Sequence, residues 1–166
     1  YNSNILKLAA AAHAGDAEKP KIIAIGKKAI EYFSKRGYDV VGSYPTIAEN
    51  IKPAQAQDIA DTAVEMFRRG EVDDVQIFFT MFVSQLTQEA QQMAVLPMQT
   101  QDIGDYGVMD YDPSPEAVFD RIVPKFAASL VQCAVVEAYA SEQGARRTAM
   151  ESATDNADAM TESLSL

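Results

Sequence analysis

Phosphate binding is the first chemistry that the residue types suggest, at Gly26-Lys27-Lys28. In nucleotide-binding α/β proteins, a glycine-rich turn and a lysine after a buried strand hold the phosphates. The second glycine of the dinucleotide fingerprint is missing after Gly26. A P-loop would need a glycine at Lys21 and a serine or threonine at Lys28. Since neither motif is complete, we expect Gly26 to be the turn between a strand and a helix.

Calcium binding is the second candidate chemistry, in the acidic segment that begins at Asp110. Asp110, Asp112 and Ser114 have the spacing of the first ligands of an EF-hand loop. Pro115 occupies the position of the required glycine, and Arg121 the position of the bidentate glutamate. The calcium motif therefore fails.

The remaining reactive residues do not form a site of their own. His13 is the only histidine, which excludes a histidine triad or a multi-histidine metal site within this chain. Cys133 has apolar neighbours and is expected to be a small packing residue, and Asp73-Asp74 are expected to be solvated. The sequence thus predicts no catalytic residues, no metal site and no cofactor in this chain.

The composition narrows the class of protein further. The chain has 166 residues, a net charge of −10 and a pI near 4.5, which argues against a nucleic-acid binder. No stretch offers the roughly 18 to 20 uninterrupted apolar residues of a membrane span. Residues 1–83 carry 10 basic and 11 acidic side chains, whereas residues 84–166 carry 4 and 13. The acidic half predicts a docking surface for a basic partner, and the alternative is a solvated surface.

The first half of the sequence predicts alternating helices and strands. Helical spacing begins after Asn2 and ends by Gly15, and a buried strand is expected over 21–26. A helix over 27–36 and a second strand over 38–44 follow. The clearest amphipathic helix begins at Pro53 and ends at Gly70. Its apolar face is expected to comprise Ala56, Ile59, Ala60, Ala63, Val64 and Phe67.

The second half predicts a hairpin and then one long helix. Residues 75–83 are apolar on both faces, and 90–98 follow closely enough for an antiparallel hairpin. We therefore expect an α/β fold with a Rossmann-like layered sheet, mostly parallel, with an antiparallel edge hairpin. Residues 1–113 would form this domain, and residues 114–166 a long protruding C-terminal helix that continues through Pro124.

That helix would reach about 78 Å, far beyond a domain with a radius of gyration of about 13 Å. Met150, Ala153, Ala157, Met160 and Leu164 have heptad spacing, which favours pairing with another helix. The alternative is one amphipathic helix that folds back on the sheet. The chain begins at Tyr1 and ends without a stop signal, so we expect a piece of a longer protein whose missing parts supply the partner helix.

Several motifs resemble the γ subunit of bacterial F-type ATP synthase over nearly the whole chain. Residues 1–4 resemble the end of its D-R-G-L-C-G-G-[LY]-N-[ST]-N motif, and residues 25–38 its I-G-K-K-G…F-F…R-R-G segment. Residues 111–115 resemble Y-E-P-x-P. The most specific match is 140–157, which resembles A-S-E-x-x-A-R-M-x-A-M-x-x-A-T-x-N-A. Arg147 and Asp112 depart from the usual methionine and glutamate.

This resemblance implies a non-catalytic rotor subunit. In the family, N- and C-terminal helices form an antiparallel coiled-coil shaft inside the ring of α and β subunits. The α/β domain lies against the ε subunit and the c ring, at the cytoplasmic face of the cell membrane, and membrane contact occurs only through the complex. Rotation driven by proton or sodium flow is coupled to ATP synthesis, and nucleotides bind elsewhere. The resemblance places Tyr111, Asp112 and Pro113 in a c-ring-facing loop and Arg146, Met150, Ala153 and Ala157 on the shaft helix.

Two other functions stay open from the residues alone. One is a small enzyme with a degenerate nucleotide pocket at the strand ends, which predicts measurable nucleotide binding. The other is an adaptor whose C-terminal helix forms a homodimer through residues 145–166. For the ring-facing loop, the alternative is a plain turn that precedes the last helix.

Overall fold

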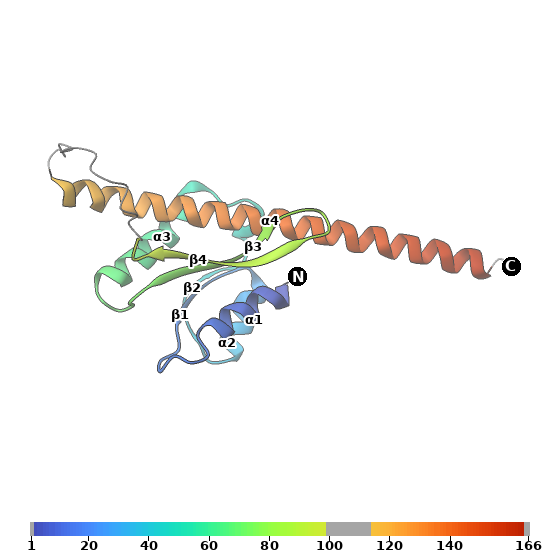
Figure 1. The fold of residues 1–166 in the computed structure, drawn as a ribbon, viewed down its shortest axis with the longest axis horizontal. Coiled ribbons are helices and arrows are strands. Elements are labelled where there is room, and N and C mark those ends of the chain that lie inside the picture. Colours follow the sequence, from blue (N-terminus) through green and yellow to red (C-terminus); the bar gives the residue numbers. More distant parts are fainter. Residues whose placement is uncertain (1, 99–113, 165–166) are drawn as a thin grey trace, which may run out of the picture.

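The computed structural model describes residues 2–98 and 114–164. Figure 1 shows a small α/β body from which one long helix projects. In chain order the elements are α1 (Asn2–Ala12), β1 (Lys21–Ile25), α2 (Lys27–Lys35), β2 (Asp39–Tyr44), the short 3-10 helix η1 (Ile47–Glu49), α3 (Pro53–Arg68), β3 (Val75–Phe82), β4 (Gln88–Leu96) and α4 (Pro115–Leu164). The expected order of helices and strands is confirmed, with η1 as an additional turn.

The first two strands and the helix between them form a βαβ unit. β1 and β2 are parallel, with Lys21 beside Asp39 and Ile25 beside Tyr44. Gly26 joins β1 to α2 with a φ of 95°, a conformation that glycine adopts without steric cost. Its N–H donates to the Tyr44 carbonyl oxygen at 2.8 Å. Gly26 is therefore the predicted turn, fixed to the end of the neighbouring strand.

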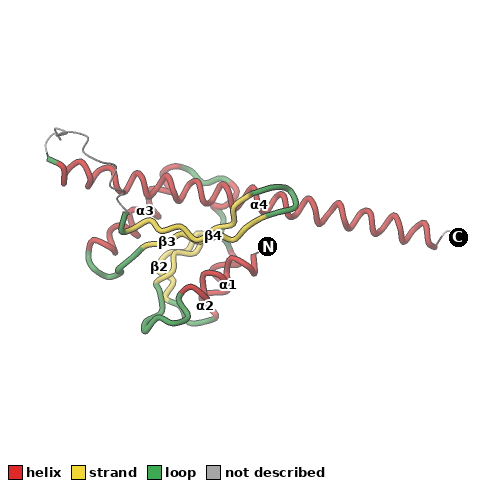
Figure 2. The backbone as a smooth tube through the Cα atoms, in the orientation of Figure 1, coloured by secondary structure: helices red, strands yellow, loops and turns green. Residues whose placement is uncertain are grey.

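The second pair of strands is the predicted antiparallel hairpin. β3 and β4 pair from Val75 opposite Leu96 to Phe82 opposite Gln88. The α/β class, the parallel pair, the hairpin and the long helix are all confirmed. Within the described residues, however, the strands form two separate two-stranded sheets, β1-β2 and β3-β4, and not one hydrogen-bonded sheet. Figure 2 shows the two pairs crossing next to one another.

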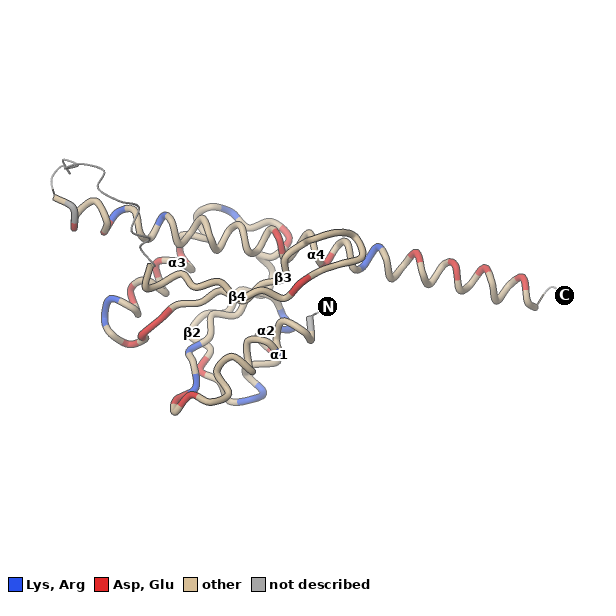
Figure 3. The backbone as a smooth tube through the Cα atoms, viewed as in Figure 1, with Lys and Arg blue, Asp and Glu red and all other residues tan. Residues whose placement is uncertain are grey.

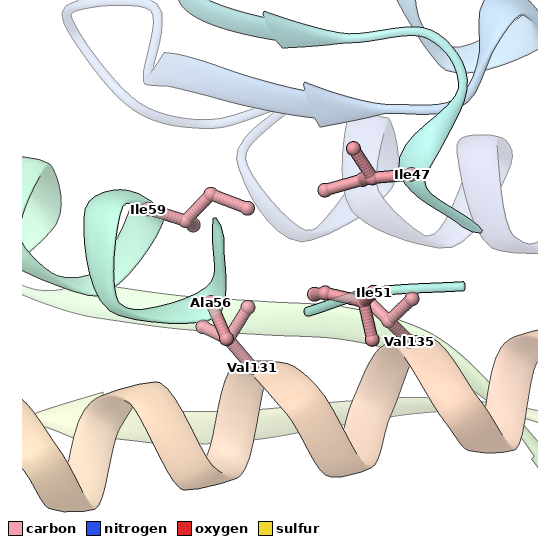
Figure 4. Close-up of a cluster of buried hydrophobic side chains, with 6 residues drawn as sticks. All are labelled: Ile47, Ile51, Ala56, Ile59, Val131 and Val135. Carbon is pink, nitrogen blue, oxygen red and sulfur yellow. The ribbon is translucent and has the colours of Figure 1, made fainter. Parts of the chain in front are cut away.

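The hydrophobic core lies between the strands, α3 and the first half of α4. One cluster joins η1 and α3 to α4, and Figure 4 shows its members pointing toward one another: Ile47, Ile51, Ala56, Ile59, Val131 and Val135. A second cluster contains Ala60, Val64, Val95, Leu96, Ala127 and Ala128. Burying one Ile or Val side chain stabilises the fold by roughly 1.5–3 kcal/mol. The predicted apolar face of α3 is thus the face that packs against α4.

Helix α4 has two parts with different surroundings. Its first part lies along α3 and β3, and its last part extends beyond the body into open space (Figure 1). All side chains of residues 151–164 are exposed. The helix continues through Pro124, as expected.

By length and composition, α4 is the one helix of the described residues that could cross a membrane. An 18-residue window within it has a mean hydropathy of 1.3, and 28% of that window is buried. This is weak evidence for a span, because a helix in the core of a water-facing domain meets the same test. The packing of α4 on α3 and β3 accounts for the apolar residues of its buried face.

Candidate functional site

The buried face of α4 is made of small and β-branched residues. Ala127, Ala128, Val131, Ala134 and Val135 are each at most 8% exposed. Counted from Ala127 they stand at i, i+1, i+4, i+7 and i+8, so they lie on one face of the helix. Alanine at these positions lets the backbone of α4 approach α3 and the hairpin closely.

A second apolar stripe runs along the outside of the same part of α4. Phe119, Ile122, Phe126 and Val136 are 44–54% exposed, and Cys133 is exposed as well. With Ser129 and Ala140, these residues follow steps of 3, 4, 3, 4, 3 and 4, which is the heptad spacing of a coiled-coil seam. We call Phe119, Ile122, Phe126, Ser129, Cys133, Val136 and Ala140 the outer stripe.

Sequence reasoning misses the outer stripe and misplaces Cys133. The apolar neighbours of Cys133 predict a packing residue, but the structure exposes its thiol on the outer stripe, so that prediction is wrong. The heptad spacing is present in the sequence. It is hidden because the opposite face is also apolar, and only the packing of α3 shows which of the two faces is covered.

The predicted shaft residues lie on the projecting part of α4. Arg146, Met150, Ala153 and Ala157 are all exposed, and Met150 is 58% exposed. Arg146 pairs with Glu142, and Arg147 with Glu151 at 2.8 Å, one turn along in each case. Met160 and Leu164 extend the apolar seam to the end of the described helix. These residues are brought together only along one helix, and nothing in the described chain covers them.

Charge changes along the projecting helix. After Arg147, the charged residues of the described helix are Glu151, Asp155, Asp158 and Glu162, all acidic. Figure 3 shows them as successive red segments toward the C-terminal end. Arg147 has its pKa raised by a hydrogen bond from its side chain to Glu151 and by that residue's charge. The acidic half of the sequence thus includes an extended acidic helix.

The tip of the β3-β4 hairpin holds α4 where the helix leaves the body. The Phe82 N–H donates to Glu137 Oε2 at 3.1 Å, and Thr148 Oγ1 donates to the Gln85 carbonyl oxygen at 3.1 Å. Between them, Gly144 faces the Phe82 ring, and a Cβ on Gly144 would lie 2.9 Å from Phe82 Cε2. The hairpin therefore contacts α4 over three turns and fixes its rotation and its position along its axis.

The predicted c-ring-facing loop falls outside the described residues, and with it Tyr111, Asp112 and Pro113. Its C-terminal flank is described. Ser114 Oγ accepts a hydrogen bond from the Ala117 N–H at 3.2 Å, as an N-cap does. The pKa of Glu116, in the first turn, is lowered by hydrogen bonds from its own backbone and from Ser114. Ser114 is thus the cap at which α4 begins, at the domain boundary that the sequence predicts.

The other candidate residues have structural partners or lie in solvent. Lys27 and Lys28 at the start of α2 are exposed. His13 Nδ1 lies 2.7 Å from Asp16 Oδ2, and its ring lies edge-on to Phe78. In the described part of the chain, no three His, Cys, Asp or Glu residues are grouped so that they could hold a metal ion.

Two cavities lie against α4. One of about 330 Å³ between α3 and α4 is lined by Asp61, Val64, Glu65, Arg68, Arg69 and Pro124. Its arginines are engaged, Arg68 by Asp120 at 2.8 Å and Arg69 by Glu65 at 2.7 Å. The other, of about 180 Å³, is lined by Asn4, Thr80, Gln88, Ala90 and Ala145. Neither combines a nucleophile with a base.

These features define a class of protein. It is an α/β domain that anchors a long, projecting helix whose exposed apolar seam suits a partner helix, which is the architecture of a subunit in an assembly. The family model described as ATP synthase matches residues 1–166. The chain belongs to this ATP synthase family.

Relatives and a solved structure agree with that assignment. The ATP synthase gamma chain of Ruminococcus albus is 46% identical, and the match covers 100% of this chain and 60% of the relative. The ATP synthase gamma chain of Alkaliphilus metalliredigens is 41% identical, with the same coverage. The sodium-ion-specific ATP synthase gamma chain of Acetobacterium woodii is 35% identical over 100% of this chain and 62% of its own length. The resemblance found in the sequence motifs is confirmed, and the chain spans about 60% of the length of these relatives.

The fold is also found in a solved assembly. The cryo-EM structure of the Tetrahymena thermophila mitochondrial ATP synthase central stalk and c ring contains a chain that superposes with a TM-score of 0.72. The match covers 92% of this chain and 69% of that chain, at 20% identity. At this identity the likeness shows the fold.

Proposed function

We propose that this chain is the α/β domain and part of the shaft of a γ subunit, the central rotor of a bacterial F-type ATP synthase. The observation that carries the proposal is the apolar seam of α4. The seam has two segments on different faces of the helix: the outer stripe up to Ala140, and Met150, Ala153 and Ala157 beyond Arg146. A helix with such a seam gains roughly 25 cal/mol for each Å² of apolar surface that a partner helix removes from water.

The proposed mechanism uses this chain as a mechanical part. The α/β domain is turned by the c ring, which proton flow drives. The contacts of the β3-β4 hairpin with Glu137, Gly144 and Thr148 transmit this rotation to α4. The projecting part of α4 turns inside the ring of α and β subunits, where ATP is made. Partners are the α, β and ε subunits and the c ring, and the chain meets the cell membrane only through that complex, on its cytoplasmic face. The chain itself is proposed to be non-catalytic.

Substitutions on the outer stripe test the partner helix. In the full-length subunit, Phe126→Glu with Val136→Glu places two charges in the proposed seam, whereas Ala54→Glu places one on the exposed start of α3. Co-purification with the α and β subunits should fall at least tenfold for the first variant and stay unchanged for the second. Equal assembly of both variants, with folding checked by circular dichroism, would contradict the proposal.

A second experiment tests the proposed ring-facing loop. Asp112 would place a carboxylate next to Tyr111 and Pro113, opposite the polar loops of the c ring. Asp112→Lys in the full-length subunit should weaken c-ring retention in a pull-down more than Asp16→Lys does. Asp16 is a suitable control because it is exposed and its carboxylate lies 2.7 Å from His13 of its own turn. Equal retention of both variants counts against the loop assignment.

A further inference from the structure

Proline inside a helix leaves a carbonyl oxygen without its normal donor. Pro124 lacks the N–H that would bond the carbonyl oxygen four residues earlier, which belongs to Asp120. That oxygen is then satisfied by another donor or by water, or the helix bends at the proline. Asp120 lies in the second turn of α4, within reach of the end of α3.

Arg68 reaches this same carbonyl oxygen from α3. Its Nη2 atom donates to the Asp120 main-chain oxygen at 3.3 Å and to Asp120 Oδ1 at 2.8 Å. One guanidinium nitrogen therefore contacts both the backbone and the side chain of the residue that Pro124 deprives of a partner. The Pro124 ring and Arg68 also line the same cavity between α3 and α4.

We infer that Arg68 is a positioning residue. It supplies the hydrogen bond that is missing at Pro124 and so holds the first turns of α4 against the end of α3. A guanidinium suits this role because its planar group carries several donors and stays charged at every working pH. A plain surface ion pair would explain the 2.8 Å contact to the carboxylate but gives no reason for the contact to the carbonyl oxygen. The inference concerns the folded chain alone, so it stands apart from the proposed rotor function.

Arg68 has a second favourable interaction that must be separated from this role. It is the last residue of α3, where a cation interacts well with the carbonyl end of the helix. That interaction does not depend on Pro124. A substitution of Pro124 should therefore weaken the contribution of the hydrogen bond to Asp120 and leave the interaction with the end of α3 unchanged.

A double-mutant cycle in the full-length protein makes the distinction. Pro124→Ala restores an N–H to the helix, so the Asp120 carbonyl oxygen regains an internal donor. Arg68→Ala should lower the folding equilibrium constant roughly threefold with Pro124 present, in keeping with a partly exposed contact. In the Pro124→Ala background, Arg68→Ala should change the logarithm of the folding equilibrium constant by less than half as much. Urea denaturation supplies the constants, and single-amide hydrogen exchange should show faster opening of the first turns of α4 in Arg68→Ala.

Three further variants complete the test. Arg69→Ala removes a neighbouring arginine that pairs with Glu65, and its effect should be the same in both backgrounds. Asp120→Asn removes the carboxylate charge but keeps the carbonyl oxygen, so it should cost less than Arg68→Ala. Arg68→Lys keeps a charged donor group but loses the planar guanidinium, so its effect should lie between those of the wild type and Arg68→Ala. An Arg68→Ala effect that is independent of position 124, or one that Asp120→Asn reproduces in full, would overturn the inference.

Discussion

Ser141 donates a hydrogen bond from its hydroxyl to the main-chain oxygen of Thr80 at 3.1 Å, and both residues are buried. Ser141 is fully inaccessible, and the bond joins α4 to the second half of β3 across 61 residues of sequence. Along α4 it lies between the Glu137 and Thr148 contacts with the hairpin. A buried polar link of this kind fixes the register of two packed elements, because any other register leaves polar groups without partners.

We expect Ser141→Ala to destabilise the protein by about 1–2 kcal/mol, since it removes the donor and leaves a buried carbonyl oxygen with one partner fewer. Ser129→Ala is the matched control. Ser129 lies on the same helix and donates to Lys125 of its own turn at 3.0 Å, but it is exposed. In residues 1–166, where the outer stripe is exposed, its replacement should change stability by no more than about 0.5 kcal/mol. Urea denaturation of the two variants checks the difference, and equal losses would contradict the register role of Ser141.

Gly144 is expected to accept no branched side chain. Alanine is a better helix former than glycine by about 1 kcal/mol, so the helix alone would favour a larger residue. A Cβ at this position meets the Phe82 ring at 2.9 Å, and a branched residue adds methyl groups beyond it. Gly144→Val should therefore cost about 1–3 kcal/mol as overpacking.

Ala149→Val serves as the comparison for Gly144→Val. It introduces the same side chain on the same helix at an exposed position and should cost less than about 0.7 kcal/mol. Combining Gly144→Val with Phe82→Ala should recover part of the loss, because the clashing ring is gone. Thermal or chemical denaturation of the three variants would show this. A full loss in the absence of Phe82 would mean that the ring is not the obstacle.

Much of this arrangement could be predicted from the sequence, because local signals and tertiary packing agree. Pro53 begins α3, the apolar face of α3 is the buried one, and Gly26 turns the chain between β1 and α2. The contacts between the β3-β4 hairpin and α4 could not be predicted. In the sequence, Ser141, Gly144 and Thr148 look like ordinary residues of a helix surface, and only the fold places the hairpin against them. The position of Cys133 is predicted wrongly for a related reason: α4 is apolar on two faces, and only its neighbours decide which face is inside.

Ionisation of Tyr44 is expected to lower the free energy of unfolding at high pH. Its hydroxyl donates to Asp58 Oδ2 at 2.7 Å, and its pKa is raised to about 12, first by burial, then by this hydrogen bond and the charge of Asp58. In the unfolded chain the phenol titrates near 10, so between about pH 10 and 12 the unfolded state binds fewer protons than the native state. The contribution of Tyr44 to the free energy of unfolding is therefore complete below about pH 10 and is lost as the pH rises toward 12.

The comparison of wild type with Tyr44→Phe isolates that contribution from the other groups that titrate at high pH. The wild type should lose more stability than the variant between about pH 9 and 12, since the variant has no phenol to ionise at that site. Asp58→Asn should lower the pKa of Tyr44 only in part, because burial, the largest single cause, remains. Spectrophotometric titration of the phenols measures this pKa directly. Parallel stability curves for wild type and Tyr44→Phe would refute the assignment.

The outer stripe makes the exposure of Cys133 a direct measure of whether a partner helix is present. In residues 1–166 alone the thiol is exposed, so an alkylating reagent should modify it at the rate of a free cysteine. In the full-length subunit, a helix paired along Phe126, Cys133 and Val136 would cover it, and modification should slow at least tenfold. Mass spectrometry of the peptide that contains Cys133 distinguishes it from any other cysteine of the longer chain. Phe126→Glu should restore fast modification, because a charge in the seam opposes pairing. Equal rates in the short and the full-length chains would show that no helix covers this stripe.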